Sequence, residues 1–257
     1  MRIIVLIKQV PDTYGERTLL PDGRVDRDRS DAVIDEINER AIEVALRRKD
    51  ADKATEVIVM SMGPESATSS LRKALSMGAD SAVHVLDDEL VGADAVRSAL
   101  VIARAVERIG HVDLVLAGDA STDGRGGVIP AMVAEHLGLS YLTSLDNLQV
   151  DADVRGTQTT ESGTRDVRAP LPALVSVTES ADEARFPGFK GIISAKRKRI
   201  DVVSLSDLGI DPSFPGLARS IVLSTAARPT REAGIKIHDE GAAADRLIEF
   251  LVAERLI

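Results

Sequence analysis

Cysteine and tryptophan are missing from this sequence, and aromatic residues make up only 2% of its 257 residues. Without thiols there can be no disulfides, thiolate metal sites or cysteine nucleophiles. With so few aromatic rings, the core must be built from Val, Ile, Leu and Ala, which favours buried parallel strands covered by helices. Apolar runs such as MRIIVLIKQV at residues 1–10 are too short for a signal peptide or a membrane span. We therefore expect a cytoplasmic protein without a membrane segment.

Recognisable catalytic and metal-binding patterns are also missing. The four histidines, at positions 84, 111, 136 and 238, show no ligand spacing. The sequence has no H-E-x-x-H motif, no nucleophile elbow and no SGGxDS-type pyrophosphatase loop. We predict no metal site and no catalytic residue, although an enzyme that uses Asp and Glu alone stays open at this point. The net charge of −9 argues against binding to bulk nucleic acid.

Strand-like and helix-like segments alternate through the first half of the chain. Short runs rich in Val and Ile predict strands over 2–7, 56–62, 81–86 and 112–117. Apolar residues at helical spacing predict helices over 30–50, 66–77 and 93–109. The first of these helices would be capped by Ser30 or Asp31. The alternation specifies an α/β fold with a mostly parallel sheet, whose ligands bind at the carboxyl ends of the strands, near the switch in strand order.

The pattern of alternating strands and helices ends after Gly138. Short extended runs separated by polar turns occur over 148–150, 167–168 and 173–177. We interpret these runs as antiparallel additions to the same sheet. Segment 211–257 is punctuated by Pro and Gly before a predicted terminal helix over 242–256. We therefore divide the chain into an α/β domain, 1–210, and an extended C-terminal arm, 211–257.

The loop GDASTDGRGG, at 118–127, leaves the fourth predicted strand and enters a helix that starts near Pro130. Four glycines and small hydroxyl residues before a helix leave backbone N–H groups free to bind an anion. The loop matches neither GxxxxGK[ST] nor GxGxxG, so a plain surface loop stays open. However, Lys8 and Gly63 follow two other strands and would lie at the same edge of the sheet. The domain 1–210 is thus predicted to bind a nucleotide.

Segment RFPGFKGIISAKRKR, at 185–199, gathers six basic side chains and two phenylalanines without an acidic residue. In an acidic chain, such a segment predicts an exposed loop that holds an apolar anchor inside a basic rim and grips a transient protein partner. The alternative is that Phe186 and Phe189 belong to a local core and that the Lys/Arg run is a solvated face. The segment alone does not decide between the two.

Longer motifs resemble the β subunit of electron transfer flavoprotein, especially its actinobacterial-type, non-bifurcating members. They are VLIKQVPDT at 5–13, VIDEINERAIEVAL at 33–46, SMGP at 61–64, RKALSMGAD at 72–80, DLVLAGDASTDGRGG at 113–127, LPALVSV at 171–177, ARFPGFKGIISAKRK at 184–198 and DLGI at 207–210. The resemblance covers nearly the whole chain. It implies a Rossmann-like sheet of the adenine nucleotide hydrolase-like type and an electron-transfer component that is not itself a catalyst.

In that family the β subunit carries a buried AMP of structural role and pairs with an α subunit that holds FAD. The resemblance implies that AMP is lined by Leu6, Lys8, Asn38, Met62, Gly63, Gly118, Ser121, Thr122, Asp123, Gly124, Gly126, Gly127 and Val128. An aromatic residue close to the flavin is also implied, and Tyr14 is the candidate. The arm 211–257 would pack on the α subunit.

The family docks acyl-CoA dehydrogenases and related flavin dehydrogenases through a recognition loop, which is 183–199 here. The docking residues implied are Arg185, Phe186, Phe189, Lys190, Ile192, Lys196 and Arg197. Phe189 stands where the family usually inserts a leucine into a pocket on the dehydrogenase. The resemblance further implies that electrons from fatty acid β-oxidation pass to a flavoprotein-quinone oxidoreductase type acceptor of the respiratory chain.

The chain departs from the family pattern at Asp35-Glu36-Ile37-Asn38, where many members have Asn-Pro-x-Asp or Asn-Pro-x-Cys. Three other interpretations stay open. A bifurcating member would hold a second FAD in place of AMP, and a stand-alone stress-type sensor would bind ATP as a homodimer. A pyrophosphatase-like adenylating enzyme is disfavoured because its phosphate-loop signature is missing.

Overall fold

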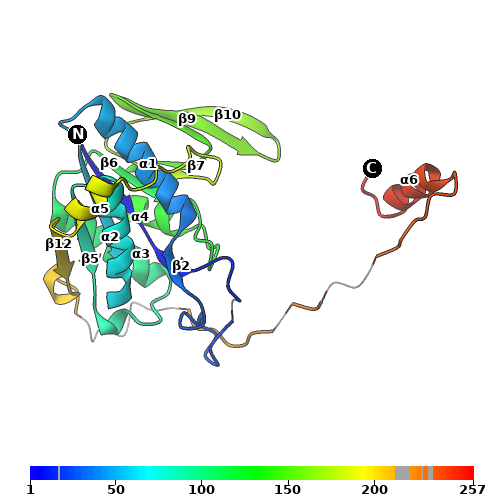
Figure 1. The fold of residues 1–257 in the computed structure, drawn as a ribbon, viewed down its shortest axis with the longest axis horizontal. Helices are drawn as coiled ribbons and strands as arrows, with labels where there is room; N and C mark the ends of the chain where they lie inside the picture. Colours follow the sequence, from blue (N-terminus) through cyan, green and yellow to red (C-terminus); the bar gives the residue numbers. More distant parts are fainter. Residues whose placement is uncertain (17, 212–219, 227, 231–233) are drawn as a thin grey trace. The chain divides into compact units, whose positions relative to one another are not determined.

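The computed structural model describes residues 1–257 except 17, 212–219, 227 and 231–233. The chain divides into two units, Met1–Leu223 and Ser224–Ile257, and each is described by itself. The main sheet of the first unit consists of β1 (Arg2–Leu6), β4 (Glu56–Met62), β5 (Ser81–Val85), β6 (Leu114–Gly118), β7 (Ser140–Leu145), β11 (Ala173–Val177) and β12 (Ile200–Val203). Its strand order is β12-β5-β4-β1-β6-β11-β7, and all of these pairings are parallel. The predicted α/β fold with a mostly parallel sheet is confirmed (Figure 1).

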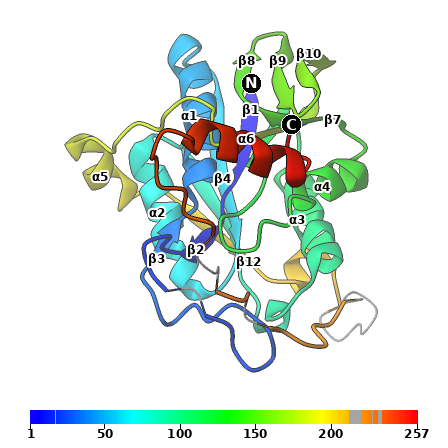
Figure 2. The same cartoon turned by 90° about the vertical axis from the view of Figure 1, so that its right-hand side faces the viewer.

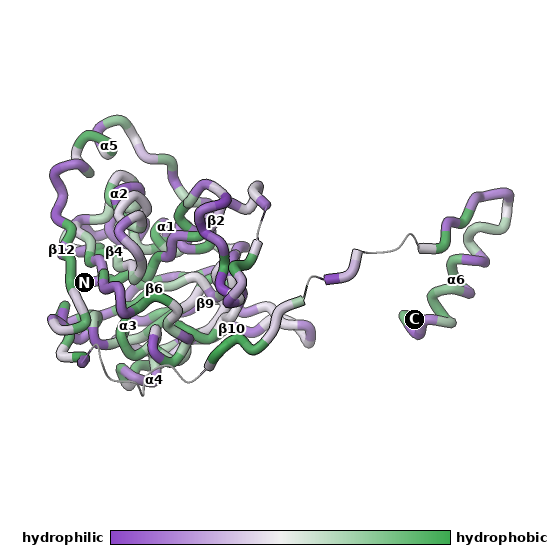
Figure 3. Tube along the Cα trace, turned by 90° about the horizontal axis from the view of Figure 1, so that it is seen from below, coloured by the Kyte–Doolittle hydropathy of each residue, from purple (hydrophilic) through white to green (hydrophobic). Residues whose placement is uncertain are grey.

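Helices cover both faces of this sheet. One face packs against α1 (Glu36–Ala51) and α2 (Thr68–Met77), and the other against α3 (Ala95–Ile109) and α4 (Ile129–Leu137) (Figure 2). Successive residues of β1 point alternately into the two cores: Ile3 and Val5 into the first, Ile4 and Leu6 into the second. Because both faces are buried, the central strands are continuous apolar runs, as Figure 3 shows along β6.

A second sheet is antiparallel and has the order β10-β9-β8, formed by β8 (Asn147–Val150), β9 (Asp153–Thr160) and β10 (Gly163–Pro170). The predicted antiparallel strands at 148–150 and 167–168 are confirmed, but they belong to this second sheet and not, as predicted, to the main sheet. Run 173–177 does join the main sheet, but as the parallel strand β11 between β6 and β7. All residues of β11 are buried, which identifies it as a central strand.

The first helix begins later than the sequence predicted. Its N-cap is Asp35, not Ser30 or Asp31, because Ala32–Ile34 form a short strand, β3, that pairs antiparallel with β2 (Gln9–Pro11). Acidic residues in the first turn of α1 and basic residues in its last turn complement the helix dipole. The other two predicted helices of this region begin at Thr68 and Ala95, close to their predicted starts.

Part of segment 183–199, predicted as an exposed loop, is helical: α5 runs from Phe189 to Ala195. Gly188 precedes this helix and Gly191 lies inside it. In the second unit, α6 (Ala243–Ala253) confirms the predicted terminal helix. Parts of the predicted arm, at 212–219, 227 and 231–233, lie outside the described residues. Of the helices in the described ranges, none is long and apolar enough to cross a bilayer.

Candidate functional site

The strand order changes direction beside β1. From β1 the chain moves outward to β4 and β5 and then returns to β6 on the other side of β1. The carboxyl ends of β1, β4 and β6, at Leu6, Met62 and Gly118, therefore lie at one edge of the sheet. In parallel sheets, ligands bind outside the strand ends at such a switch point. This edge is the candidate site.

Lys8 links three parts of the site. Its backbone N–H donates to Asn38 Oδ1 of α1 at 2.8 Å. Its ammonium group donates to Ser121 Oγ at 3.2 Å and to Asp123 Oδ1 at 2.8 Å, both in the loop after β6. The structure thus brings Lys8, Asn38, Ser121 and Asp123 together, and all four were among the predicted site residues.

Gly118 allows α1 to approach the end of β6. A Cβ added at Gly118 would lie 2.6 Å from Asn38 Nδ2 and 3.0 Å from Ile37 Cγ2. A larger residue would displace the side-chain amide of Asn38 and would press on Ile37, whose Cβ lies 3.2 Å away in the first turn of α1. The glycine therefore fixes the distance between the helix and the loop that form the two walls of the site.

Asp35 ties these two walls together and was not predicted as a site residue. Its side chain is fully buried. One carboxylate oxygen caps α1 by accepting from Ile37 N–H at 3.0 Å. The other accepts from Thr122 N–H at 2.7 Å and from Thr122 Oγ1 at 2.9 Å. An Asp before an apolar helical run is a capping signal, but only the fold shows that the same carboxylate also holds Thr122, far along the chain.

Asp123 is held by two cations. Lys8 contacts Oδ1, and Arg27 Nη2 donates to Oδ2 at 2.7 Å. The Asp123 side chain is 2% exposed, against 43% for Lys8 and 41% for Arg27. Burial raises the pKa of Asp123, but the hydrogen bonds and positive charges of Lys8 and Arg27 outweigh it and hold this pKa well below its usual range. Arg27 was missed because its partner lies 96 residues away.

Asp123→Asn is expected to lower the free energy of unfolding by about 2 kcal/mol at neutral pH, since Lys8 and Arg27 lose their shared partner and are themselves partly exposed. Because the folded-state pKa lies below the ordinary value of about 3.9, the stabilisation by the carboxylate is fully present above that value. It is lost as pH falls through the folded-state pKa. Urea unfolding of wild type and variant should therefore show a constant difference from about pH 5 to 8 and a shrinking one below about pH 4. A difference that grows towards acid pH would contradict this role.

The loop beyond Asp123 presents free backbone donors. Gly124 N–H donates to Asp123 Oδ1 and Arg125 N–H to Ser121 O. No acceptor in the described part of the chain is bonded to the N–H groups of 126, 127 and 128. Gly127 adopts the left-handed conformation, at φ 65°, directly before Val128, the N-cap of α4. Free N–H groups ahead of a helix N-terminus favour an anion.

Met62 and Gly63 end β4 at the same edge. Gly63 N–H donates to Val85 O at 3.1 Å, and its carbonyl oxygen lies 3.0 Å from His84 Nε2. His84 is buried and its other ring nitrogen lies 3.4 Å from Thr68 Oγ1. The sequence showed no ligand spacing at His84, and in the structure its contacts with Gly63 and Thr68 hold the turn after β4. The described residues contain no group of three or more His, Asp or Glu side chains that could hold a metal ion.

The remaining predicted residues lie away from these contacts. Tyr14 follows β2, and its side chain is almost fully exposed. Phe186 is 93% exposed and Phe189 is 79% exposed, so neither belongs to a local core. Ile192, Lys190, Lys196 and Arg197 are exposed on or beside α5. Arg185 differs from them because its guanidinium contacts Glu43 and Asp50 of α1.

Comparison with known proteins supports one family. The model of the electron transfer flavoprotein domain matches residues 22–208. The chain is 46% identical to the electron transfer flavoprotein subunit beta of Mycobacterium tuberculosis, over 99% of each chain. It is 31% identical to the subunit of the same name from Megasphaera elsdenii over the full length of both. It is also 32% identical to subunit CarD of the caffeyl-CoA reductase-Etf complex of Acetobacterium woodii, over 86% of this chain and 84% of the relative. The chain belongs to the electron transfer flavoprotein family, among its β subunits.

Proposed function

We propose that this chain pairs with an α subunit, accepts electrons from acyl-CoA dehydrogenases and related flavin dehydrogenases, and passes them to the respiratory chain through a quinone-linked flavoprotein in the cytoplasm. The observation that carries the proposal is the exposure of Phe186 and Phe189 within a basic segment of a chain of this family. Exposed aromatic side chains beside charges of one sign are suited to a transient protein partner. The basic rim would steer an acidic partner surface.

We further propose that the site at the switch point holds AMP. The free N–H groups at 126–128, ahead of α4, suit a phosphate group, and the partly exposed ammonium of Lys8 brings a positive charge to the same loop, at Ser121 and Asp123. Met62, which is partly buried, supplies apolar surface at the end of β4, while Leu6 at the end of β1 is buried in the second core. Asp35 and Gly118 hold the loop and α1 in place around this space. The residues present therefore fit a small anionic nucleotide.

FAD, held mainly by the α subunit, supplies the electron-carrying chemistry when bound. The proposed part of this chain is positional: it stabilises the scaffold through the nucleotide site and holds the donor through α5 and its flanks. Tyr14 is proposed to lie near the flavin, and its exposed ring is available for such a contact. The second unit is proposed to pack on the α subunit, since α6 exposes Leu247, Ile248 and Val252.

The test is to co-express the chain with its α subunit, denature the purified complex, and identify the released nucleotides by chromatography and mass. We expect one FAD and one AMP per heterodimer. Release of two FAD molecules per heterodimer would mean that the site proposed for AMP holds a second flavin instead. A colourless homodimer that binds ATP would favour the sensor, and release of pyrophosphate from ATP would favour the adenylating enzyme. Neither nucleotide together with no stable pairing would overturn the proposal.

A further inference from the structure

Helix α5, which is proposed to dock the electron donor, is unusually short. It has seven residues, Phe189–Ala195, and a helix of that length is not stable by itself in water. Yet it presents Phe189, Ile192 and Ile193, which are 79%, 49% and 49% exposed. Burial of these side chains therefore does not hold the helix. Ala195 is the buried residue of α5, so contacts of the backbone and of neighbouring elements must fix its position.

Gly191 brings α5 into backbone contact with α2. A Cβ added at Gly191 would lie 2.2 Å from Ser76 O, in the last turn of α2. A backbone atom so close cannot move aside as the tip of a side chain can. The glycine is therefore required for the approach of the two helices, which explains its presence in the middle of a short helix, where glycine is otherwise unfavourable.

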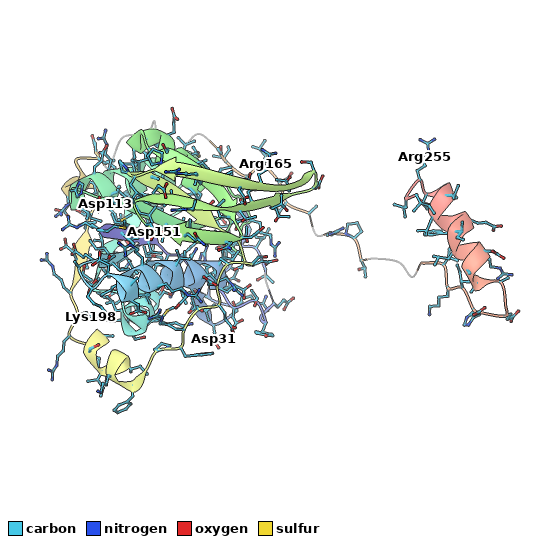
Figure 4. The ribbon with its side chains drawn as sticks, turned by 90° about the horizontal axis from the view of Figure 1, so that it is seen from above. Asp31, Asp113, Asp151, Arg165, Lys198 and Arg255 are labelled. Carbon is cyan, nitrogen blue, oxygen red and sulfur yellow. The ribbon has the colours of Figure 1, made fainter. Side chains whose placement is uncertain are left out.

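Two basic side chains bridge the same helices in opposite directions. Arg72 of α2 donates from Nη1 to Ala195 O at 2.6 Å and to Lys198 O at 2.7 Å, where α5 ends. Lys198 donates from Nζ to Leu75 O at 2.9 Å and to Ala79 O at 2.5 Å, where α2 ends. Each cation thus satisfies carbonyl groups at the C-terminal end of the other helix, where a positive charge is favourable. Figure 4 labels Lys198 close to α5, on the side of the sheet that carries α1 and α2.

The start of the segment is held separately. Arg185 donates from Nε to Glu43 Oε2 at 2.7 Å and from Nη2 to Glu43 Oε1 at 2.9 Å, and its Nη1 lies 2.8 Å from Asp50 Oδ2. Burial raises the pKa of Glu43, but the hydrogen bonds and charge of Arg185 outweigh it, so this pKa is lowered. Arg185 therefore ties the chain just before Phe186 to α1. The segment is fixed at both ends, with the exposed apolar side chains between.

We propose that Arg72, Lys198 and Gly191 form a joint between α2 and α5 that positions the docking side chains before the partner arrives. The inference rests on the proposed function, in which α5 docks a flavin dehydrogenase. A segment that is ordered in advance binds without losing further conformational freedom, whereas a loose segment must be ordered during docking. Arg72 and Lys198 are thus positioning residues: their charges are engaged with helix carbonyls and are not free to contact a partner.

Arg72→Met tests the joint in the complete heterodimer with both nucleotides bound. The variant keeps the aliphatic stem of Arg72 but removes both hydrogen bonds to the end of α5, while neighbouring Leu71 and Leu75 remain buried in the core. We expect the KM of an acyl-CoA dehydrogenase for the heterodimer to rise roughly tenfold with kcat unchanged. Hydrogen exchange of the amides of α5 should accelerate, since the helix opens more often. Arg72→Lys should raise KM less than Arg72→Met does, because the shorter side chain still places a positive charge near the same carbonyls.

Arg104→Met is the matched control, since Arg104 is an exposed arginine on α3 whose partner is Glu107, and it should leave KM and exchange unchanged. A double variant of Arg72→Met with Phe189→Ala should raise KM by less than the product of the single effects, because both act through the same docked side chain. Arg72→Met with an unchanged KM, or fully multiplicative effects, would overturn the joint while leaving the proposed function standing. A wild-type heterodimer that no flavin dehydrogenase reduces would overturn both.

Discussion

Asp35→Ala is expected to lower the free energy of unfolding by about 3 to 5 kcal/mol, since two separate losses add up. The variant removes the N-cap of α1, because Ile37 N–H loses its acceptor. It also removes the acceptor of the two hydrogen bonds that Thr122 donates through its N–H and its hydroxyl, at a residue that is only 5% exposed. Urea unfolding of the purified heterodimer at fixed protein concentration measures the loss.

Two further variants separate the parts of this effect. Asp35→Ser keeps a hydroxyl that can cap α1 but is too short to reach Thr122 as well, so it should recover about 1 kcal/mol of the loss. Asp31→Ala changes an exposed aspartate at the position where the sequence predicted the cap, and it should alter stability by less than about 0.5 kcal/mol. If Asp35→Ala and Asp31→Ala had equal effects, the carboxylate of Asp35 would not be the link between α1 and the loop.

The architecture could be predicted from sequence wherever burial of an element produces an apolar run or an apolar stripe. β1, β4, β5 and β6 are mostly apolar because both of their faces are buried, and α3 carries a clear apolar stripe. β10 is mostly exposed and β9 mostly half-buried, and both are largely polar, so no pattern marked them as a separate sheet. β11 was recognised as a strand, but a buried run of five residues does not reveal whether it is parallel.

The sequence predicted where the site lies, but it did not predict the contacts between its residues. Strand ends and glycine-rich loops indicate an edge of the sheet, so the sequence pointed to Lys8 and to loop 118–127. Arg27, Asp35 and Arg72 were missed because each acts on a residue far along the chain, and a charged side chain in a polar stretch looks like any solvated residue. Local helix formation in α5 was missed for the same reason: its support comes from α2, not from its own sequence.

Phe189→Ala is expected to lower kcat/KM for reduction of the heterodimer by an acyl-CoA dehydrogenase by roughly 5- to 150-fold, equivalent to about 1 to 3 kcal/mol. The side chain is 79% exposed in this chain, so its removal takes away no core contact and should leave the free energy of unfolding unchanged. The change should appear in KM, because the ring binds the partner and does not take part in electron transfer. Steady-state kinetics with the heterodimer as the varied substrate measure both parameters.

Val202→Ala is the control for loss of exposed apolar surface, since Val202 is 56% exposed on the edge strand β12 and has no proposed docking role. Its kinetics should match those of wild type. Phe189→Leu addresses the fit of the anchor: if the partner pocket is shaped for a phenyl ring, the smaller side chain leaves a gap and raises KM, whereas a pocket shaped for leucine gives a lower KM. A partner that distinguishes none of these variants does not use α5, because a buried anchor cannot lose most of its contact area without weakening the complex.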